Sequence, residues 1–395
     1  MRRAALRAAS TTGLEDRTML PIISMVIFTV LAEAVFAVLP LLVGATIERL
    51  GFTAKQAGLI GAADMFGGTV SALFVSFILS RGKWRFVLLS GIFILTVADA
   101  SSGLAQHFPA LLLSRIVAGL GEGVVLTIAY VSMGETRNPV RAYGLATAGY
   151  VAYSAPALYL MPSLLNAHGL RGVFWCLAAL TAVATLLVKH IPNRARLSGA
   201  STTQAAKIGI SKQSVIGLAG IFTYFMAQGG VWAYLDRIGM ANQIATANVG
   251  IALAISSIGG LLGALLATWL DSRYGRLKPL FCSTLCTMVS LLIFNENRTF
   301  VVFAAMASLF NFAWNFSVPY QFGALAQIDP SRRTVALGGA FVNAGLAAGP
   351  VVAAAIINER SVQNVNWMGM AFSILSLLLF ARILLRIEQP TIFRP

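Results

Sequence analysis

Five ionisable residues lie inside apolar stretches, and they are the residues of this sequence best placed to do chemistry. In chain order they are Glu33, Asp64, Asp99, Arg115 and Glu122. A charged side chain inside a bilayer is costly, so such residues commonly mark ion pathways and proton relays. Because apolar residues flank each of them, the pattern favours proton movement over a reaction on a bound substrate.

Glu33 and Glu122 are the strongest candidates for carrying a proton, because each lies near the middle of its apolar stretch. Two carboxylates that share a low-dielectric space do not ionise together cheaply, so we expect one of them to hold a proton. Arg115 and Glu122 share one helix face at a spacing of seven residues, about 10 Å apart along the axis. We interpret that gap as too long for a permanent pair, so Arg115 would set which glutamate is charged.

The alternative is a static ion pair that holds helices together. Asp64 fits either role, and for Asp99, near the end of its stretch, we predict a structural one.

Uncharged residues in the second half of the chain form candidate solute contacts at helical spacing. Amides and amphipathic rings that face a cavity can orient a polar or aromatic solute. The predicted substrate-binding residues are Tyr224, Gln228, Asn311, Trp314 and Asn315. The alternative for the asparagines is hydrogen bonding between helices. Trp232, on the face of Tyr224 and Gln228, could instead anchor the helix at the membrane interface.

The elements that carry these residues are predicted to be membrane-spanning helices. The chain has 395 residues, of which 57% are hydrophobic and only 11% charged. A soluble domain carries about 25% charged residues. Its apolar runs reach the roughly 20 residues that cross a bilayer. We predict twelve spans, at 19–47, 57–79, 86–105, 110–133, 142–165, 171–189, 214–235, 246–270, 279–294, 299–325, 334–357 and 367–387.

The positive charge predicts the orientation of these spans. The formal net charge is +15, and with the amino terminus inside, 22 of the 29 Lys and Arg residues fall in predicted cytoplasmic segments. Short cytoplasmic loops of membrane proteins are enriched in this way. The basic character therefore indicates topology in a lipid bilayer and not a nucleic-acid partner. We expect a multi-pass inner (plasma) membrane protein with both termini in the cytoplasm.

A polar, basic segment at 190–213 divides the spans into two sets of six. The predicted domains are an N-terminal six-helix bundle at 1–189, a cytoplasmic linker at 190–213 and a C-terminal six-helix bundle at 214–395. A linker at the midpoint suggests two halves related by an internal repeat.

Two local motifs resemble those of the major facilitator superfamily. The segment Asp271-Ser-Arg273-Tyr-Gly275-Arg276 is similar to its cytoplasmic loop motif between two spans. The first-half copy at 79–85 keeps basic residues but has Ser80 where the motif has Asp. The segment that begins at Arg115 and continues through Gly119-Leu-Gly121-Glu122-Gly123 is similar to a span-four signature, with a weak likeness to spinster-like carriers.

The resemblance implies an all-α membrane protein of two pseudo-symmetric six-helix bundles. It also implies that spans one, four, seven and ten line a central cavity, so that Glu33 and Glu122 would face the same space. In the family the loop Asp is thought to lock one conformation. The resemblance therefore assigns gating to Asp271, Arg273, Gly275 and Arg276.

The function predicted from these residues is proton-coupled secondary transport of a small organic solute by alternating access, with export favoured. Uptake of a small metabolite or organic acid, attracted by Arg115, is the main alternative. A membrane sensor or scaffold that carries nothing is the alternative of another class, and it would not need acids in mid-span. The expected partners are the solute, protons and the bilayer, and we expect a monomer.

Enzymatic and metal-binding patterns are absent from the sequence. It has no Gly-Lys-Ser/Thr phosphate loop, which argues against an ATP-driven pump. His107, His168 and His190 lie at the ends of predicted spans, and Cys282 and Cys286 have no histidine or carboxylate near them. We therefore predict neither an enzyme nor a bound metal or cofactor.

Overall fold

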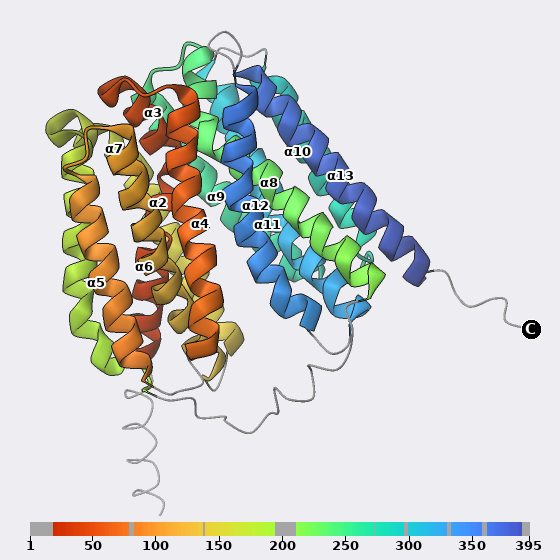
Figure 1. Ribbon diagram of the computed structural model, residues 1–395. Helices are drawn as coiled ribbons and strands as arrows, with labels where there is room; N and C mark the ends of the chain where they lie inside the picture. Colours follow the sequence, from red (N-terminus) through yellow and green to blue (C-terminus); the bar gives the residue numbers. More distant parts are fainter. Residues whose placement is uncertain are drawn as a thin grey trace, which may run out of the picture.

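The computed structural model describes residues 19–78, 83–136, 139–193, 211–271, 273–295, 299–329, 333–357 and 362–388. All regular structure in these residues is helical. The predicted linker at 190–213 lies mostly outside the described residues. Residues 79–82 of the first-half motif copy at 79–85 also lie outside them. Figure 1 shows two groups of helices side by side, here called the first half (residues 19–193) and the second half (residues 211–388).

The first half begins with the helix Met19–Ala32, which continues with breaks into the short helices α2 and α3. The remaining elements are α4 (Ala54–Ile78), α5 (Trp84–Ser102), α6 (Phe108–Gly134), α7 (Pro139–Ala184) and the 3₁₀ helix η2 (Thr185–His190). The second half contains α8 (Lys212–Ala241), α9 (Thr246–Leu270), α10 (Leu277–Phe294), α11 (Phe300–Ile328), α12 (Arg333–Ile356) and α13 (Gln363–Glu388).

Three of the predicted twelve spans differ from simple continuous helices. By length and composition, 10 helices in the described residues can cross a membrane. One of these runs from Arg141 to His190 and contains two spans, because Gly169 has a non-helical backbone with φ 65°. Glycine reaches this left-handed conformation without the steric cost that a Cβ imposes. The broken first helix completes the set of twelve.

The first helix breaks at Glu33 and Val38, between which α2 (Ala34–Ala37) forms a single turn. Pro40 follows at the start of α3 (Leu39–Leu50) and has no amide hydrogen. The carbonyl of Phe36, four residues earlier, therefore lacks the donor that a regular helix would supply. The Val38 amide donates to this carbonyl instead, and the carbonyl can still accept a second hydrogen bond in mid-span from another group.

The two halves repeat the same helix pairings. In the first half α4 and α5 both pack on α6, and in the second half α9 and α10 both pack on α11. Glycines set an equivalent register: a Cβ at Gly67 would overlap the main-chain carbonyl of Ile116, and one at Gly259 would lie 2.5 Å from that of Ser308. This register aligns Glu122 of α6 with Trp314 of α11. The halves therefore share a backbone plan but carry different chemistry in mid-span.

The halves pack tightly against each other at one end only. At the closed end, which holds the connections 51–53 and 242–245, residues of both halves form one continuous apolar cluster. Toward the other end, here the parted end, which holds the loop 271–276, the fully buried apolar residues form a separate cluster in each half. Among the described residues of the first half, only the partly buried Phe36 and Met65 pack against the second-half cluster. Figure 1 shows the same arrangement, with the helix groups converging toward the top of the view and diverging toward the bottom.

Candidate functional site

Glycines on α6 determine which side chains of three helices can meet. A Cβ at Gly119 would overlap the main-chain carbonyl of Asp64 on α4, so the two backbones touch there. On the opposite face of α6, a Cβ at Gly121 would lie 2.7 Å from the amide nitrogen of Leu95 on α5. Small residues allow such close approach between membrane helices. The Gly-rich motif therefore brings the polar residues of α4 and α5 beside those of α6.

The result is a buried ion network around Arg115. Its Nη2 lies 2.7 Å from Asp64 Oδ1, and its Nη1 lies 2.7 Å from Asp99 Oδ1. Nη2 also lies 3.4 Å from Glu122 Oε1, and Nε donates to both oxygens of Asp64 at 3.0 Å. The four side chains are at most 6% exposed, and the ring of Phe174 covers the guanidinium at 5.2 Å.

The network has more acid than base. One guanidinium, which stays charged, faces three carboxyl groups in a site shielded from water. Full ionisation would leave two negative charges without a described counter-ion, and uncompensated buried charge is strongly disfavoured. Protons are the simplest charges that can neutralise such a site. The arrangement can therefore hold or release protons as its surroundings change.

One sequence prediction about this network is wrong. The gap between Arg115 and Glu122 is not too long for a pair, because the two long side chains reach toward each other and meet at 3.4 Å. Within the described residues Glu33 has no hydrogen bond or ion pair to this network, but its carboxyl group is close enough to act electrostatically on Glu122. A shared role for the two glutamates stays a prediction. Glu33 Oε1 accepts a hydrogen bond from Tyr130 Oη at 3.1 Å. Asp99, for which a structural role is predicted, binds Arg115 as closely as Asp64 does.

Glu33 lies in a group of tyrosines that the sequence prediction did not include. It is partly buried at the first break of the initial helix. Tyr130 of α6 and Tyr143 of α7 are 39% and 40% exposed, with ring centroids 5.9 Å apart. Tyr143 Oη donates to the Tyr130 carbonyl at 2.9 Å. In the sequence, Tyr143, Tyr150 and Tyr153 recur at helical spacing, so they share one helix face. This spacing is the pattern from which a tyrosine-rich face on α7 could have been predicted.

The predicted solute contacts on α8 are fully packed in this conformation. Tyr224 and Gln228 are 2% and 0% exposed, and Tyr224 Oη lies 3.3 Å from the carbonyl of Trp314. Neither amide atom of Gln228 has a hydrogen-bond partner in the described part of the chain. Trp314 is partly exposed and forms edge-to-face contacts with Phe36 of the first half at 6.2 Å and with Trp232 at 6.4 Å. Trp314 therefore lies between the halves, where solute contact is possible.

Asn311 and Asn315 point toward α9. Asn311 Nδ2 donates to Ser256 Oγ at 3.1 Å, and Asn315 Nδ2 donates to the Asn311 carbonyl at 3.0 Å. A Cβ at Gly260 of α9 would lie 2.8 Å from Asn315 Nδ2. These contacts match the alternative of hydrogen bonding between helices, and a role in solute binding stays a prediction.

The predicted gating residues lie at the parted end. Asp271 ends α9 with φ 48°, and Gly275 has φ 70°, so the loop turns sharply at both. The guanidinium of Arg273 lies 5.7 Å from the ring of Trp269. Arg276 donates to Gln327 Oε1 of α11. Both contacts remain within the second half, and the gating role of the four residues stays a prediction.

Asp236 is a buried acid that the sequence prediction placed outside the spans. Helix α8 continues to Ala241, six residues beyond the predicted end, and Asp236 is 0% exposed. It faces Gly44 of α3, where a Cβ would overlap its Oδ2 and lie 2.9 Å from its Cγ. The second half therefore does carry an acid within a span, contrary to expectation.

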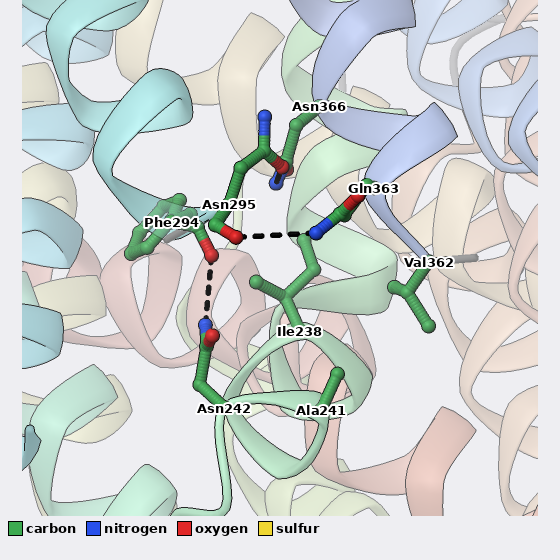
Figure 2. A pocket seen from close by; sticks show the side chains of 8 residues that line it. All are labelled: Ile238, Ala241, Asn242, Phe294, Asn295, Val362, Gln363 and Asn366. Carbon is green, nitrogen blue, oxygen red and sulfur yellow. Dashed lines mark hydrogen bonds between the residues drawn. The ribbon is translucent and has the colours of Figure 1, made fainter. Parts of the chain in front are cut away.

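A cavity of about 330 Å³ lies at the closed end within the second half (Figure 2). Its amides bind neighbouring chain atoms: Asn242 Nδ2 donates to the Phe294 carbonyl at 2.8 Å, and Gln363 Nε2 donates to the Asn295 carbonyl at 3.1 Å. Asn366 Nδ2 donates to Asn295 Oδ1 at 2.7 Å. Because these bonds tie together helix ends of one half, the cavity is not positioned to pass a solute between the halves.

Comparison with known proteins agrees with the fold and the motifs. The family model described as Major Facilitator Superfamily matches residues 22–236 and 217–393. A probable 4-methylmuconolactone transporter of Cupriavidus pinatubonensis is 22% identical over 344 residues, covering 81% of this chain and 78% of that protein. The uncharacterized MFS-type transporter YceJ of Bacillus subtilis is 24% identical over 325 residues, covering 78% of this chain and 81% of that protein.

Solved structures show the same fold at low identity. The nucleoside transporter NupG superposes with a TM-score of 0.74 at 13% identity, covering 94% of this chain and 100% of that chain. A bacterial homologue of the human lysosomal transporter Spinster, inward-facing and unoccupied, superposes with a TM-score of 0.75 at 15% identity. That match covers 95% of this chain and 99% of that chain. The chain belongs to the major facilitator superfamily, and it is a multi-pass membrane transporter, not an enzyme.

Proposed function

We propose that this transporter couples the movement of a small organic solute to protons, and that the Arg115 network is the coupling site. The observation that carries the proposal is the buried set of three carboxyl groups around one guanidinium. Intramembrane acids of this kind are costly and usually functional. Since a static pair needs only one acid, the surplus of acid favours proton exchange over a purely structural role.

Coupling would work through exchange of partners for Arg115. Asp64 and Asp99 hold the guanidinium at 2.7 Å, whereas Glu122 is the more distant partner at 3.4 Å. Glu122 is therefore the group most easily released to take a proton. Protonation of Glu122 would leave Arg115 bound to the two aspartates, and its ionisation would draw the guanidinium back. Such a change in charge can bias the equilibrium between two conformations of the carrier.

The conformation supports alternating access. We place the parted end, with the loop 271–276, at the cytoplasm, because that assignment puts the excess of basic residues inside. The structure then corresponds to an inward-open carrier, like the inward-facing Spinster homologue that it resembles. Both termini and the 190–213 linker would lie in the cytoplasm of a cell with this protein in its inner membrane.

The accessible charge favours a cationic solute and export. Arg115 is 1% exposed and engaged by three acids, so it is not free to attract an organic acid. Glu33 and the exposed rings of Tyr130 and Tyr143 offer a carboxylate beside aromatic faces, which suits an organic cation. A cation that enters from the cytoplasm would compete with a proton at Glu33, which is the behaviour of an exporter driven by proton entry.

Uptake of an organic metabolite is the second candidate. The relative named as a 4-methylmuconolactone transporter supports an organic metabolite as the solute. The two candidates differ in the direction of proton movement. In proteoliposomes that contain a pH-sensitive dye, an antiported cation and a proton should cross in opposite directions, whereas a symported solute and a proton should enter together.

The test uses purified protein in proteoliposomes with an imposed pH gradient. Tetraphenylphosphonium and 4-methylmuconolactone serve as the two probes. Replacement of Glu122 by Gln should abolish accumulation driven by the gradient, whereas solute exchange without a gradient should survive. Glu33→Gln should abolish accumulation of the cation or shift its pH optimum. Glu48→Gln is the control, because Glu48 is exposed and its ion pair with Arg237 lies outside the network. If Glu122→Gln and Glu33→Gln both accumulate the probe as wild type does, the proposed coupling is wrong.

A further inference from the structure

Asp236 is a carboxyl group buried on the boundary between the two halves. It lies in α8 about a turn and a half before the helix ends at Ala241. The residue is 0% exposed, and neither carboxyl oxygen has a hydrogen-bond partner in the described part of the chain. Its carboxyl packs directly on the main chain of Gly44 in α3, where no side chain intervenes. Contact between the halves is therefore what buries this acid.

The residues around Asp236 on α8 join the halves at the closed end. Trp232 Nε1 donates to the Phe36 carbonyl at 2.9 Å, and Tyr234 Oη donates to the Ala54 carbonyl at 2.8 Å. When the halves separate at this end, these bonds must break and the face of α8 that carries Asp236 must leave α3. Opening the closed end therefore exposes Asp236 to water, and closing removes it from water.

The neighbouring charges do not compensate the carboxyl group. Arg237 of α8 lies 3.1 Å from Glu48 of α3, and this pair is partly exposed. Arg49 of α3 donates to Asn166 of α7 at 2.9 Å, and Lys55 at the start of α4 is exposed. Within the described residues, the second-half helices packed on α8, which are α9, α11, α12 and α13, bring no charged side chain to this end. No described ion pair includes Asp236.

An ionised carboxylate in such surroundings costs far more than the neutral acid. We propose that Asp236 takes up a proton when the closed end closes and releases it when that end opens, as a second proton-linked site distinct from the Arg115 network. This inference rests on the alternating-access part of the proposed function. In an exporter, a proton from outside would then favour closure and return the carrier to the inward-open state.

The experiment measures the opening of the closed end directly, without a solute. Spin labels are placed at Lys55→Cys and Ala245→Cys, which are exposed at this end on opposite halves, after replacement of Cys176, Cys282 and Cys286 by Ser. Distances are measured by pulsed EPR in nanodiscs from about pH 5.5 to about pH 8.5. One linked proton shifts the ratio of open to closed molecules by up to about tenfold per pH unit, with the open form favoured at high pH.

Asp236→Asn should remove this pH dependence and leave the end closed throughout. Glu48→Gln removes a nearby exposed carboxylate and its ion pair with Arg237 across the halves. It should therefore shift the midpoint of the pH dependence but retain the dependence itself, because Asp236 is unchanged. Gly44→Ala should hold the end open at every pH, because its methyl group would overlap Asp236 Oδ2. A wild-type distance that does not change with pH, or an equal change in Asp236→Asn, would overturn the proposal. Failure of gradient-driven transport would leave this measurement unaffected, so the two proposals fail separately.

Discussion

The indole nitrogen of Trp232 donates a hydrogen bond to the main-chain carbonyl of Phe36, 2.9 Å away in the other half of the molecule. Pro40, four residues after Phe36, has no amide hydrogen to offer this acceptor. The carbonyl therefore accepts from the Val38 amide and from Trp232. A break in one helix thus supplies the acceptor by which another helix holds the closed end. The break in the first helix and the contact between the halves therefore depend on the same carbonyl group.

Replacement of Trp232 by Phe should weaken the closed end while keeping an aromatic ring in place. A neutral hydrogen bond contributes about 1 kcal/mol, so the population with the closed end open should rise by about fivefold. The labels at positions 55 and 245 measure this population. Trp367→Phe is the control, because Trp367 is 56% exposed on α13. Equal populations in both variants would show that the Trp232 bond does not hold the end closed.

Replacement of Arg115 by Gln should destabilise the protein strongly, because three buried acids lose their cation. Loss of one partner of a buried ion pair typically costs about 3–5 kcal/mol. The measurement is thermal unfolding of the purified protein. Adding Asp64→Asn and Asp99→Asn to the Arg115→Gln variant should restore part of the lost stability. Fewer buried carboxyl groups then lack a positive partner. Arg237→Gln, which breaks an exposed pair, should cost no more than about 1 kcal/mol. Equal losses for the two single arginine variants would contradict the assignment of a buried network.

Replacement of Gly119 by Ala should separate α6 from α4 and disrupt the site. The added methyl group would overlap the main-chain carbonyl of Asp64. Because this carbonyl is part of the α4 backbone, it can move away only if the helix moves with it. We expect a lower unfolding temperature and loss of gradient-driven transport. Gly144→Ala is the matched control, because a Cβ there meets no atom within 4 Å and alanine favours a helix by about 1 kcal/mol. A fully active Gly119→Ala variant would refute the role of close packing.

A reporter fused at residue 200 should be active in the cytoplasm. The expectation follows from the placement of 22 of the 29 basic residues on that side. Paired fusions of alkaline phosphatase and green fluorescent protein at the same position provide the measurement, since each is active on one side only. Phosphatase activity without fluorescence would reverse the topology and the assignment of the parted end.

Replacement of Asp271 by Asn should shift the carrier between its conformations. Asp271 ends α9 at the parted end, where Arg276 of the same loop binds Gln327 within the second half. If it locks the alternative conformation by contacts to the first half, the Asn variant should populate the inward-open state more. Thiol accessibility of single cysteines at both ends measures the shift. Unchanged accessibility at both ends would reject the gating role.

Much of the fold was predictable because bilayer thickness fixes helix length, and apolar runs show where helices cross. The prediction ended the seventh span at Leu235 because Asp236 looks like a boundary in sequence, whereas burial against Gly44 keeps it inside the helix. The relation between Arg115 and Glu122 was misjudged because axial rise counts backbone distance and ignores the reach of two long side chains.

The tyrosines near Glu33 could not be identified from their types. Tyrosine is common where membrane helices meet the interface, so Tyr130 and Tyr143 have an ordinary explanation until the fold places them beside an acid. Asp99 presented the same difficulty, because its contact with Arg115 depends on how closely α5 packs on α6 at Gly121. The sequence shows which residues are ionisable or aromatic. Which of them contact one another depends on how helices far apart in the sequence pack together.

The main-chain acceptor at Phe36 has a consequence for mutational screens of this protein. Alanine scanning would change the Phe36 side chain and leave its carbonyl in place. The scan would report the loss of apolar packing and of the ring contact with Trp314, but not the hydrogen bond from Trp232. The acceptor is instead governed by residue 40, since any residue but proline there could return an amide hydrogen to Phe36. Pro40 carries no charge and has no hydrogen bond to Trp232. A substitution at Pro40 should therefore reveal the Trp232–Phe36 hydrogen bond, which replacement of the Phe36 side chain misses.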